Sequence, residues 1–113
     1  MKISNLNALK ETVVAARETL AFMNADTDKV NCLIEAKDCI EMALDDLKQD
    51  GVDKGGLSAI QSLEDAVRWL ERAQEFAIRD TKKEANVVDE LIASQCRAII
   101  PMADSIINNS LSM

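Results

Sequence analysis

The sequence predicts an all-α protein, an antiparallel helical bundle of four main helices in a single domain over residues 1–113. Three observations favour this fold. Apolar residues recur at steps of three and four along most of the chain, which places one apolar seam on each helix. No stretch shows the strict apolar–polar alternation of a half-buried strand. The three glycines all lie in residues 51–56, so only this segment has the unambiguous composition of a loop.

The first expected helix covers residues 5–24 and follows Ser4, a good N-cap. Its apolar residues form a strict two-in-seven seam of the coiled-coil type. This seam consists of Leu6, Leu9, Val13, Ala16, Leu20 and Met23.

The second expected helix follows a turn at residues 25–28, where either Asp26 or Thr27 serves as its cap. It ends near residues 49–50, and Gly51 fits the left-handed position that follows a helix C-terminus. Its seam consists of Val30, Leu33, Ala36, Ile40, Ala43, Leu44 and Leu47.

The third expected helix begins near residue 57. Thr81 and Glu84 form a capping box, which predicts that this helix ends near Asp80 and that a fourth begins at Thr81. Because no Gly or Pro separates the two, one unbroken helix over residues 58–100 is the competing interpretation. The inward residues of the third helix are Leu57, Ile60, Leu63, Val67, Leu70, Ala73 and either Phe76 or Ala77.

The fourth expected helix contains the only proline of the chain, Pro101. Proline lacks the amide hydrogen that would bond to the carbonyl of Arg97, so Pro101 either kinks this helix or begins a short fifth one. The seam before it consists of Val88, Leu91, Ile92, Cys96 and Ile99.

The charge of the chain limits the classes of partner. Twenty acidic and thirteen basic side chains give a net charge of −7, whereas strong binding to a nucleic-acid duplex needs clustered Lys and Arg. We therefore expect no duplex binding, and an acidic mimic of nucleic acid is an alternative function. No uninterrupted apolar run approaches about 18 residues, and the N-terminus lacks the apolar segment of a secretory signal. These features, with three cysteines read as free thiols, predict a cytoplasmic protein that contacts no membrane.

The usual parts of an active site are missing from the sequence. It contains no histidine or tyrosine to act as a general acid or base, and no glycine-rich phosphate loop. Cys32 and Cys39 lie seven residues apart, so their sulfur atoms would be about 10 Å apart along a helix and could not share one zinc ion. We therefore expect no enzyme activity, no cofactor and no metal.

Trp69 is the only tryptophan and lies beside the seam of the third expected helix, flanked by Arg68 and Arg72. Its structural interpretation is that Trp69 is an amphipathic residue that seals the edge of the core. Its functional interpretation is the anchor of a protein interface, because Trp and Arg are enriched at interface hot spots. Lys37, at a seam-like spacing from Leu33, either extends its charge to solvent or marks a polar position at an oligomer interface.

Residues 57–69 resemble the hairpin helix of phage anti-CBASS proteins that act as cyclic-oligonucleotide sponges. The resemblance is carried by Leu63, Glu64, Ala66, Val67 and Trp69, with Asp65 where the family has Glu. It implies a small helical protein that assembles into oligomers and sequesters cyclic signalling nucleotides in pockets between subunits. It also implies that Lys54, Arg68 and Arg72 are the cations to contact phosphate.

Taken together, the sequence predicts a small non-enzymatic cytosolic binding protein of the kind that phages and mobile elements encode, acting as an inhibitor or adaptor. Its expected partner is a host protein or a second copy of itself, and the expected interface residues are Trp69, Arg68 and Arg72. An alanine-rich core buries little area per residue, so self-association would add stability. The alternatives are the oligomeric sponge with a cyclic nucleotide as ligand and the acidic mimic.

Overall fold

The computed structural model describes residues 1–23 and 27–111, and the side chains of all of these except 27 and 50–55. The described chain is helical and contains no strand. It forms three helices: α1 (Ile3–Phe22), α2 (Thr27–Lys83) and α3 (Val87–Leu111). None of the described helices is both long and apolar enough to cross a lipid bilayer.

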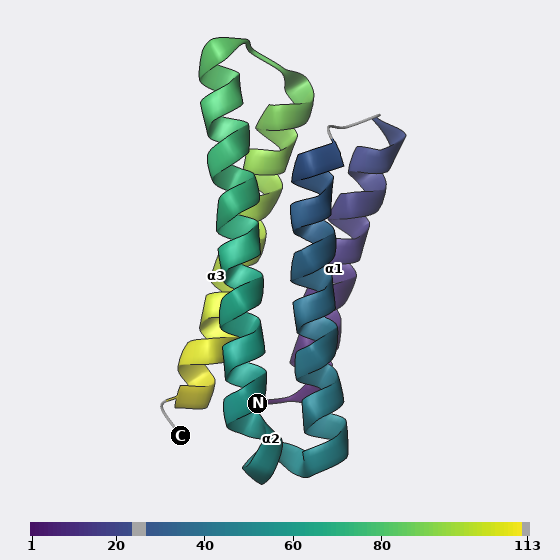
Figure 1. Ribbon diagram of the computed structural model, residues 1–113, viewed down its shortest axis with the longest axis vertical. Helices are drawn as coiled ribbons and strands as arrows, with labels where there is room; N and C mark the ends of the chain where they lie inside the picture. The colour runs from purple at the N-terminus through teal and green to yellow at the C-terminus, as the bar shows by residue number, and fades with distance from the viewer. Residues whose placement is uncertain (24–26, 112–113) are drawn as a thin grey trace.

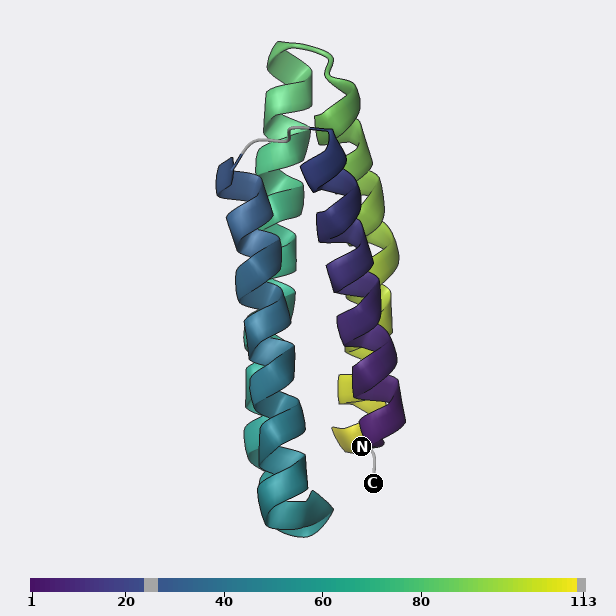
Figure 2. The ribbon, with the colours of Figure 1, turned by 90° about the vertical axis from the view of Figure 1, so that its right-hand side faces the viewer.

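Helix α2 folds back on itself. A straight helix of its 57 residues would be about 85 Å long, but the whole molecule extends only 47 Å along its longest axis. Ser58 Oγ donates a hydrogen bond of 2.8 Å to Asp46 Oδ2, although twelve residues of straight helix would separate them by about 18 Å. We call residues 27–49 the first arm and residues 56–83 the second arm of α2, and the two arms lie side by side (Figures 1 and 2).

Four helical segments therefore pack together, namely α1, the two arms of α2, and α3. Both chain termini lie near the same end of the molecule as the reversal of α2, whereas the end of α1 and the start of α3 lie toward the other end (Figure 1). The chain reverses direction near the glycine segment, as expected, but α2 is helical through residues 51–56, so the expected loop does not form and Gly51 lies within the helix rather than after its end. Asp26, one expected cap, lies outside the described residues, and the side chain of Thr27, the other, lies outside the described side chains.

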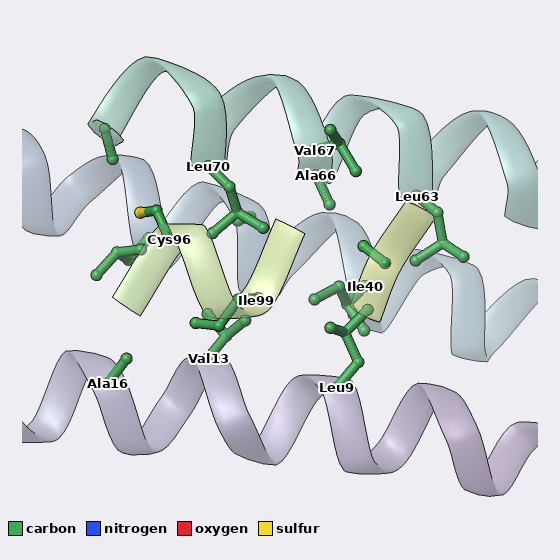
Figure 3. Packing of buried hydrophobic residues seen from close by; sticks show 14 of the residues in the cluster. Leu9, Val13, Ala16, Ile40, Leu63, Ala66, Val67, Leu70, Cys96 and Ile99 are labelled. Atoms are coloured by element: carbon green, nitrogen blue, oxygen red, sulfur yellow. The ribbon is translucent and has the colours of Figure 1, made fainter. Parts of the chain in front are cut away.

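The core lies along the axis between these four segments. The seam predicted in α1 is buried from Leu6 to Leu20, whereas Met23, its expected last member, is 36 % exposed because it follows the end of the helix. Leu9 and Val13 point toward Ile40 and Ile99 across the core (Figure 3). Fully buried alanines, whose small side chains let helices approach closely, complete the core: Ala36, Ala43, Ala59, Ala66, Ala73, Ala77 and Ala103.

The start of α1 differs from the prediction. The helix begins at Ile3, and Ser4 lies inside it rather than at its N-cap. Lys2 occupies the N-cap position without a side-chain hydrogen bond. This end of the helix is exposed, so water can satisfy the amides that a cap would otherwise bind.

The junction between α2 and α3 confirms a break in the helix but not its predicted position. Thr81 does not cap a helix, because its hydroxyl donates to the carbonyl of Ala77 one turn earlier within α2. The cap is Asn86, whose side-chain oxygen accepts a hydrogen bond of 2.8 Å from the amide of Val88. The alternative of one unbroken helix over residues 58–100 is therefore wrong. The break lies a few residues after Thr81, where the capping box predicted it.

Pro101 lies within α3, which continues to Leu111, so no separate fifth helix begins there. Pro101 and Arg97 are both exposed. Water can therefore hydrate the Arg97 carbonyl that Pro101 leaves without a helical donor.

Candidate functional site

The candidate site begins at Trp69 on the second arm of α2. Its ring is half-buried and packs against the hydrophobic core. The Cζ atom of Arg72 lies 4.8 Å from the centre of this ring, within the range of a cation–π contact. Residues three apart share a helix face, so this pairing follows directly from the sequence order. Trp69 thus seals the core with one edge and presents a guanidinium-covered face to solvent.

A hollow of about 240 Å³ opens beside Trp69, between the two arms of α2. Arg68, also on its rim, forms an ion pair with Asp65 one turn earlier. The three predicted interface residues therefore line one site. The hollow is lined by Cys39, Asp65, Arg68, Trp69 and Arg72, and we call it the Trp hollow.

A second hollow of about 140 Å³ lies one heptad further along the same arm. There the Cζ atom of Arg79 lies 4.8 Å from the centre of the Phe76 ring, which repeats the pairing of Arg72 with Trp69. Seven residues correspond to two helical turns and about 10.5 Å. This hollow is lined by Asp28, Lys29, Phe76, Arg79 and Asp80, and we call it the Phe hollow. The two hollows share no lining residue, and we call the surface between the arms that carries both of them the α2 groove.

The α2 groove carries charges of both signs, because Arg68, Arg72, Arg79 and Lys29 line it together with Asp28, Asp65 and Asp80. Its second arm exposes Arg68, Arg72 and Arg79 within twelve residues. A guanidinium held over an aromatic ring keeps its donors available for carboxylate acceptors at its edge. The sequence indicated the first aromatic–arginine pair but missed the second, because Phe76 was an alternative to Ala77 as a core residue. The structure buries Ala77 fully and leaves Phe76 half-buried.

Cys39, which lines the Trp hollow, has a thiol whose surroundings weaken it as a nucleophile. Burial raises the pKa of its thiol, and the nearby carboxylates of Asp65, Glu35 and Asp38 raise it further. The thiolate is the reactive form of cysteine, so the raised pKa lowers the reactive fraction of this thiol. The hollow offers aromatic and ionic contacts.

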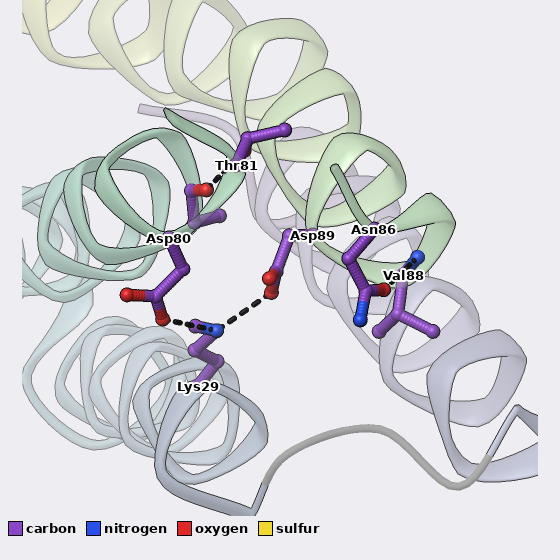
Figure 4. A network of polar contacts seen from close by, with 7 residues as sticks. Lys29, Asp80, Thr81, Asn86, Val88 and Asp89 are labelled. Carbon is purple, nitrogen blue, oxygen red and sulfur yellow. Dashed lines mark hydrogen bonds and ion pairs between the residues drawn. The ribbon is translucent and has the colours of Figure 1, made fainter. Parts of the chain in front are cut away.

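A buried ion cluster forms one wall of the Phe hollow (Figure 4). Lys29 Nζ lies 2.6 Å from Asp89 Oδ1 and 2.7 Å from Asp80 Oδ2. The side chains of Lys29 and Asp89 are only 6 % and 10 % exposed, whereas that of Asp80 is 37 % exposed. The cluster joins the start of the first arm, the end of the second arm and the start of α3. It therefore fixes the helix ends that position Phe76 and Arg79.

Hydrogen bonding decides the charge state of this cluster. Burial alone would lower the pKa of Lys29, but the hydrogen bonds to Asp80 and Asp89 outweigh it and raise the pKa above its ordinary value. The bond from Lys29 holds the pKa of Asp80 below its ordinary value. Lys29 is therefore a cation in the folded protein, and it is engaged by two carboxylates.

The remaining predicted positions have other roles or lie outside the described part. Lys37 is half-buried at the surface, where its Nζ lies 3.5 Å from Asp38 and 3.8 Å from Glu41. Glu41 also pairs at 3.5 Å with Lys10, so Lys37 belongs to a surface network between α1 and the first arm. The side chain of Lys54 lies outside the described ones.

The cysteines of the described chain form no disulfide. Cys32 and Cys96 are buried, and burial, followed by the neighbouring Cys32, raises the pKa of Cys96 to about 12. Among the described residues, no group of three or more His, Cys, Asp or Glu side chains is arranged to hold a metal ion.

Comparison with known proteins found no matching family model, no similar curated protein and no similar solved structure.

Proposed function

We propose that this protein is a non-enzymatic binding protein that docks a helical segment of a partner protein in the α2 groove. One observation carries this proposal. Two half-buried aromatic rings, Trp69 and Phe76, each lie beneath an arginine and are spaced by one heptad along the groove. Large aromatic residues with neighbouring arginines are the typical anchors of protein interfaces. A helix laid along the groove can place side chains at positions i and i+7 into the two hollows.

The antiparallel direction of the four segments supports the same proposal. We infer that α1, the two arms of α2 and α3 alternate in direction, because the connected helix ends lie at opposite ends of the molecule in turn (Figure 1). The arms of α2 then form a rigid hairpin whose outer face is free for a partner. Free thiols favour a reducing compartment such as the cytoplasm for this activity.

The cyclic-oligonucleotide sponge is the second candidate, because Arg68 and Arg72 flank an aromatic ring where phosphates and a base could bind. Two features make it the weaker one. Arg68 is already paired with Asp65, and Arg72 covers the face of Trp69 on which a base would stack. The acidic mimic, the third candidate, would use a carboxylate face instead of the α2 groove.

Affinity capture with the wild-type chain and with Trp69→Ala tests the proposal. We expect Trp69→Ala to reduce capture of the partner at least tenfold while the chain stays folded, because the ring is only half-buried. Met102→Ala is the matched control, since Met102 is a partly exposed apolar residue on α3 away from the groove. Equal capture by all three chains would reject the α2 groove as the docking site.

Thermal unfolding with a panel of cyclic di- and trinucleotides separates the sponge from the docking protein. A sponge at a ligand concentration of 100 Kd would be stabilised by about 2.7 kcal/mol. We expect no stabilisation. A shift that Arg68→Ala abolishes would favour the sponge instead. For the acidic mimic, capture would collapse as salt is added.

A further inference from the structure

The outer side of α1 carries a second stripe of residues opposite the buried seam. Its members recur at steps of three and four, and every one of them is exposed. Phe22, at the end of the stripe, is 91 % exposed, the highest value of any large apolar residue in the described chain. The stripe consists of Ser4, Ala8, Glu11, Ala15, Glu18 and Phe22, and we call it the α1 stripe.

The α1 stripe matches the α2 groove in charge and spacing. Glu11 and Glu18 lie one heptad apart, and neither forms an ion pair with another described residue. Arg72 and Arg79 also lie one heptad apart, and within the described chain neither has a carboxylate oxygen within 4.0 Å, although the charge of Arg79 acts on nearby Asp80. Both pairs are therefore spaced by about 10.5 Å along a helix.

The two surfaces also match in shape. Ala8 and Ala15 alternate with the two glutamates, so Glu11 and Glu18 are the only long side chains between the ends of the α1 stripe. The 20 residues of α1 make a rod about 30 Å long, which fits along the arms of α2. Phe22 supplies an apolar anchor at one end of the rod.

We propose that the occupant of the α2 groove is the α1 stripe of a second copy of this chain, with Glu11 and Glu18 bound to Arg72 and Arg79. The proposal rests on the proposed function in one respect, that the α2 groove docks a helix of a protein. The stripe and the groove are different patches, so each copy offers one of each. Assembly then closes as a ring or a reciprocal dimer, or continues as an open chain.

Charge reversal with complementation tests this proposal. The wild-type chain, of 12.4 kDa, is expected to sediment as a multiple of that mass. Arg72→Glu/Arg79→Glu and Glu11→Arg/Glu18→Arg should each weaken self-association by about 100-fold or more, because like charges then face one another. Mixing these two variants should restore association, since a reversed groove meets a reversed stripe. Circular dichroism confirms that each variant is folded.

Matched controls use charges outside both patches. Arg97→Glu and Asp104→Arg change exposed residues of α3 and should leave the mass unchanged. A wild-type chain that stays monomeric at every soluble concentration would overturn the proposal. So would self-association that survives both reversals, or reversed variants that fail to associate when mixed.

The failure of this proposal is distinguishable from failure of the proposed function. A monomeric chain that captures another protein in a Trp69-dependent manner rejects the second copy and keeps the α2 groove as a docking site. If Trp69→Ala changes neither the oligomeric state nor the capture of other proteins, both the proposed function and the second-copy proposal are rejected.

Discussion

Replacing Lys29 with methionine removes the cation of the buried cluster and keeps a side chain of similar length. The carboxylate of Asp89, only 10 % exposed and 2.6 Å from Lys29 Nζ, then remains buried without its partner. Breaking a buried ion pair in this way costs about 3–5 kcal/mol, and burial of the methionine side chain offsets about 1–2 kcal/mol of that loss. Asp80 is more exposed, so we assign no stabilisation energy to it. We expect Lys29→Met to lower the free energy of unfolding by about 1–4 kcal/mol, with a central value of about 2.5 kcal/mol.

Urea unfolding followed by far-ultraviolet circular dichroism measures this loss. With a denaturant slope of about 1.5 kcal/mol per molar urea, the midpoint should fall by about 1.7 M, within a range of about 0.7–2.7 M, with the slope unchanged. Lys10→Met is the matched control, because the Lys10–Glu41 pair is 3.5 Å long but 36 % and 40 % exposed. Its loss should cost less than about 1 kcal/mol.

A double mutant shows whether the cost comes from the unpaired charge. Asp89→Asn keeps the shape of the side chain and removes its charge, so Lys29→Met/Asp89→Asn should be clearly more stable than Lys29→Met alone. Equal midpoints for wild type and Lys29→Met, within about 0.5 kcal/mol, would refute the role assigned to the cluster.

Further predictions concern pH, thiol reactivity and helix capping. The folded pKa of Asp80 lies below 3.8, so its stabilisation is present above pH 3.8 and is lost as pH falls through the folded value. The pKa of Lys29 in the folded protein lies above 10.5, so its stabilisation is fully present below pH 10.5 and is lost as pH rises through the folded-state pKa. Urea midpoints of wild type should therefore fall at both extremes more than those of Lys29→Met, and parallel profiles would contradict this. Cys96, buried with a pKa of about 12, should react with iodoacetamide only on unfolding and after half-buried Cys39, as mass spectrometry of timed samples would reveal. Asn86→Ala should cost about 1 kcal/mol in urea unfolding through the lost cap, and no change would exclude that role.

The helical architecture was predictable because each segment carries its own seam. Leu6 to Leu20 repeat with a helical period, and burial of one face follows from that period alone. The helix ends were less predictable, because Ser4 and Thr81 have good capping chemistry but lie inside helices. Packing of the seams decides where a helix continues, and a cap adds only about 1 kcal/mol.

The buried cluster could have been predicted in part. Lys29 lies four residues before Leu33 in the seam of the first arm, and Asp89 lies three before Ile92 in the seam of α3. A charged residue in a seam position near a helix start needs an opposite charge, and two such residues on different helices predict each other. Lys37 was the more conspicuous charged residue in the sequence, because its distance from Leu33 resembles a seam spacing.

Only part of the Trp hollow could be predicted from the sequence. Arg68, Trp69 and Arg72 could be placed together from helical spacing, but Cys39 belongs to the other arm. Its place across from Trp69 depends on the register between the arms, which the reversal of α2 sets. No local pattern encodes that register, because it follows from how the two seams pack.

The emission of Trp69 tests the central claim most directly, because the chain has a single tryptophan and no tyrosine. If the α2 groove docks a second copy, the emission maximum should move to shorter wavelength as the protein concentration rises through the range of self-association. Arg72→Glu/Arg79→Glu should keep the longer wavelength throughout. An emission maximum that does not change while sedimentation shows the chain assembling would place the interface elsewhere and contradict the claim.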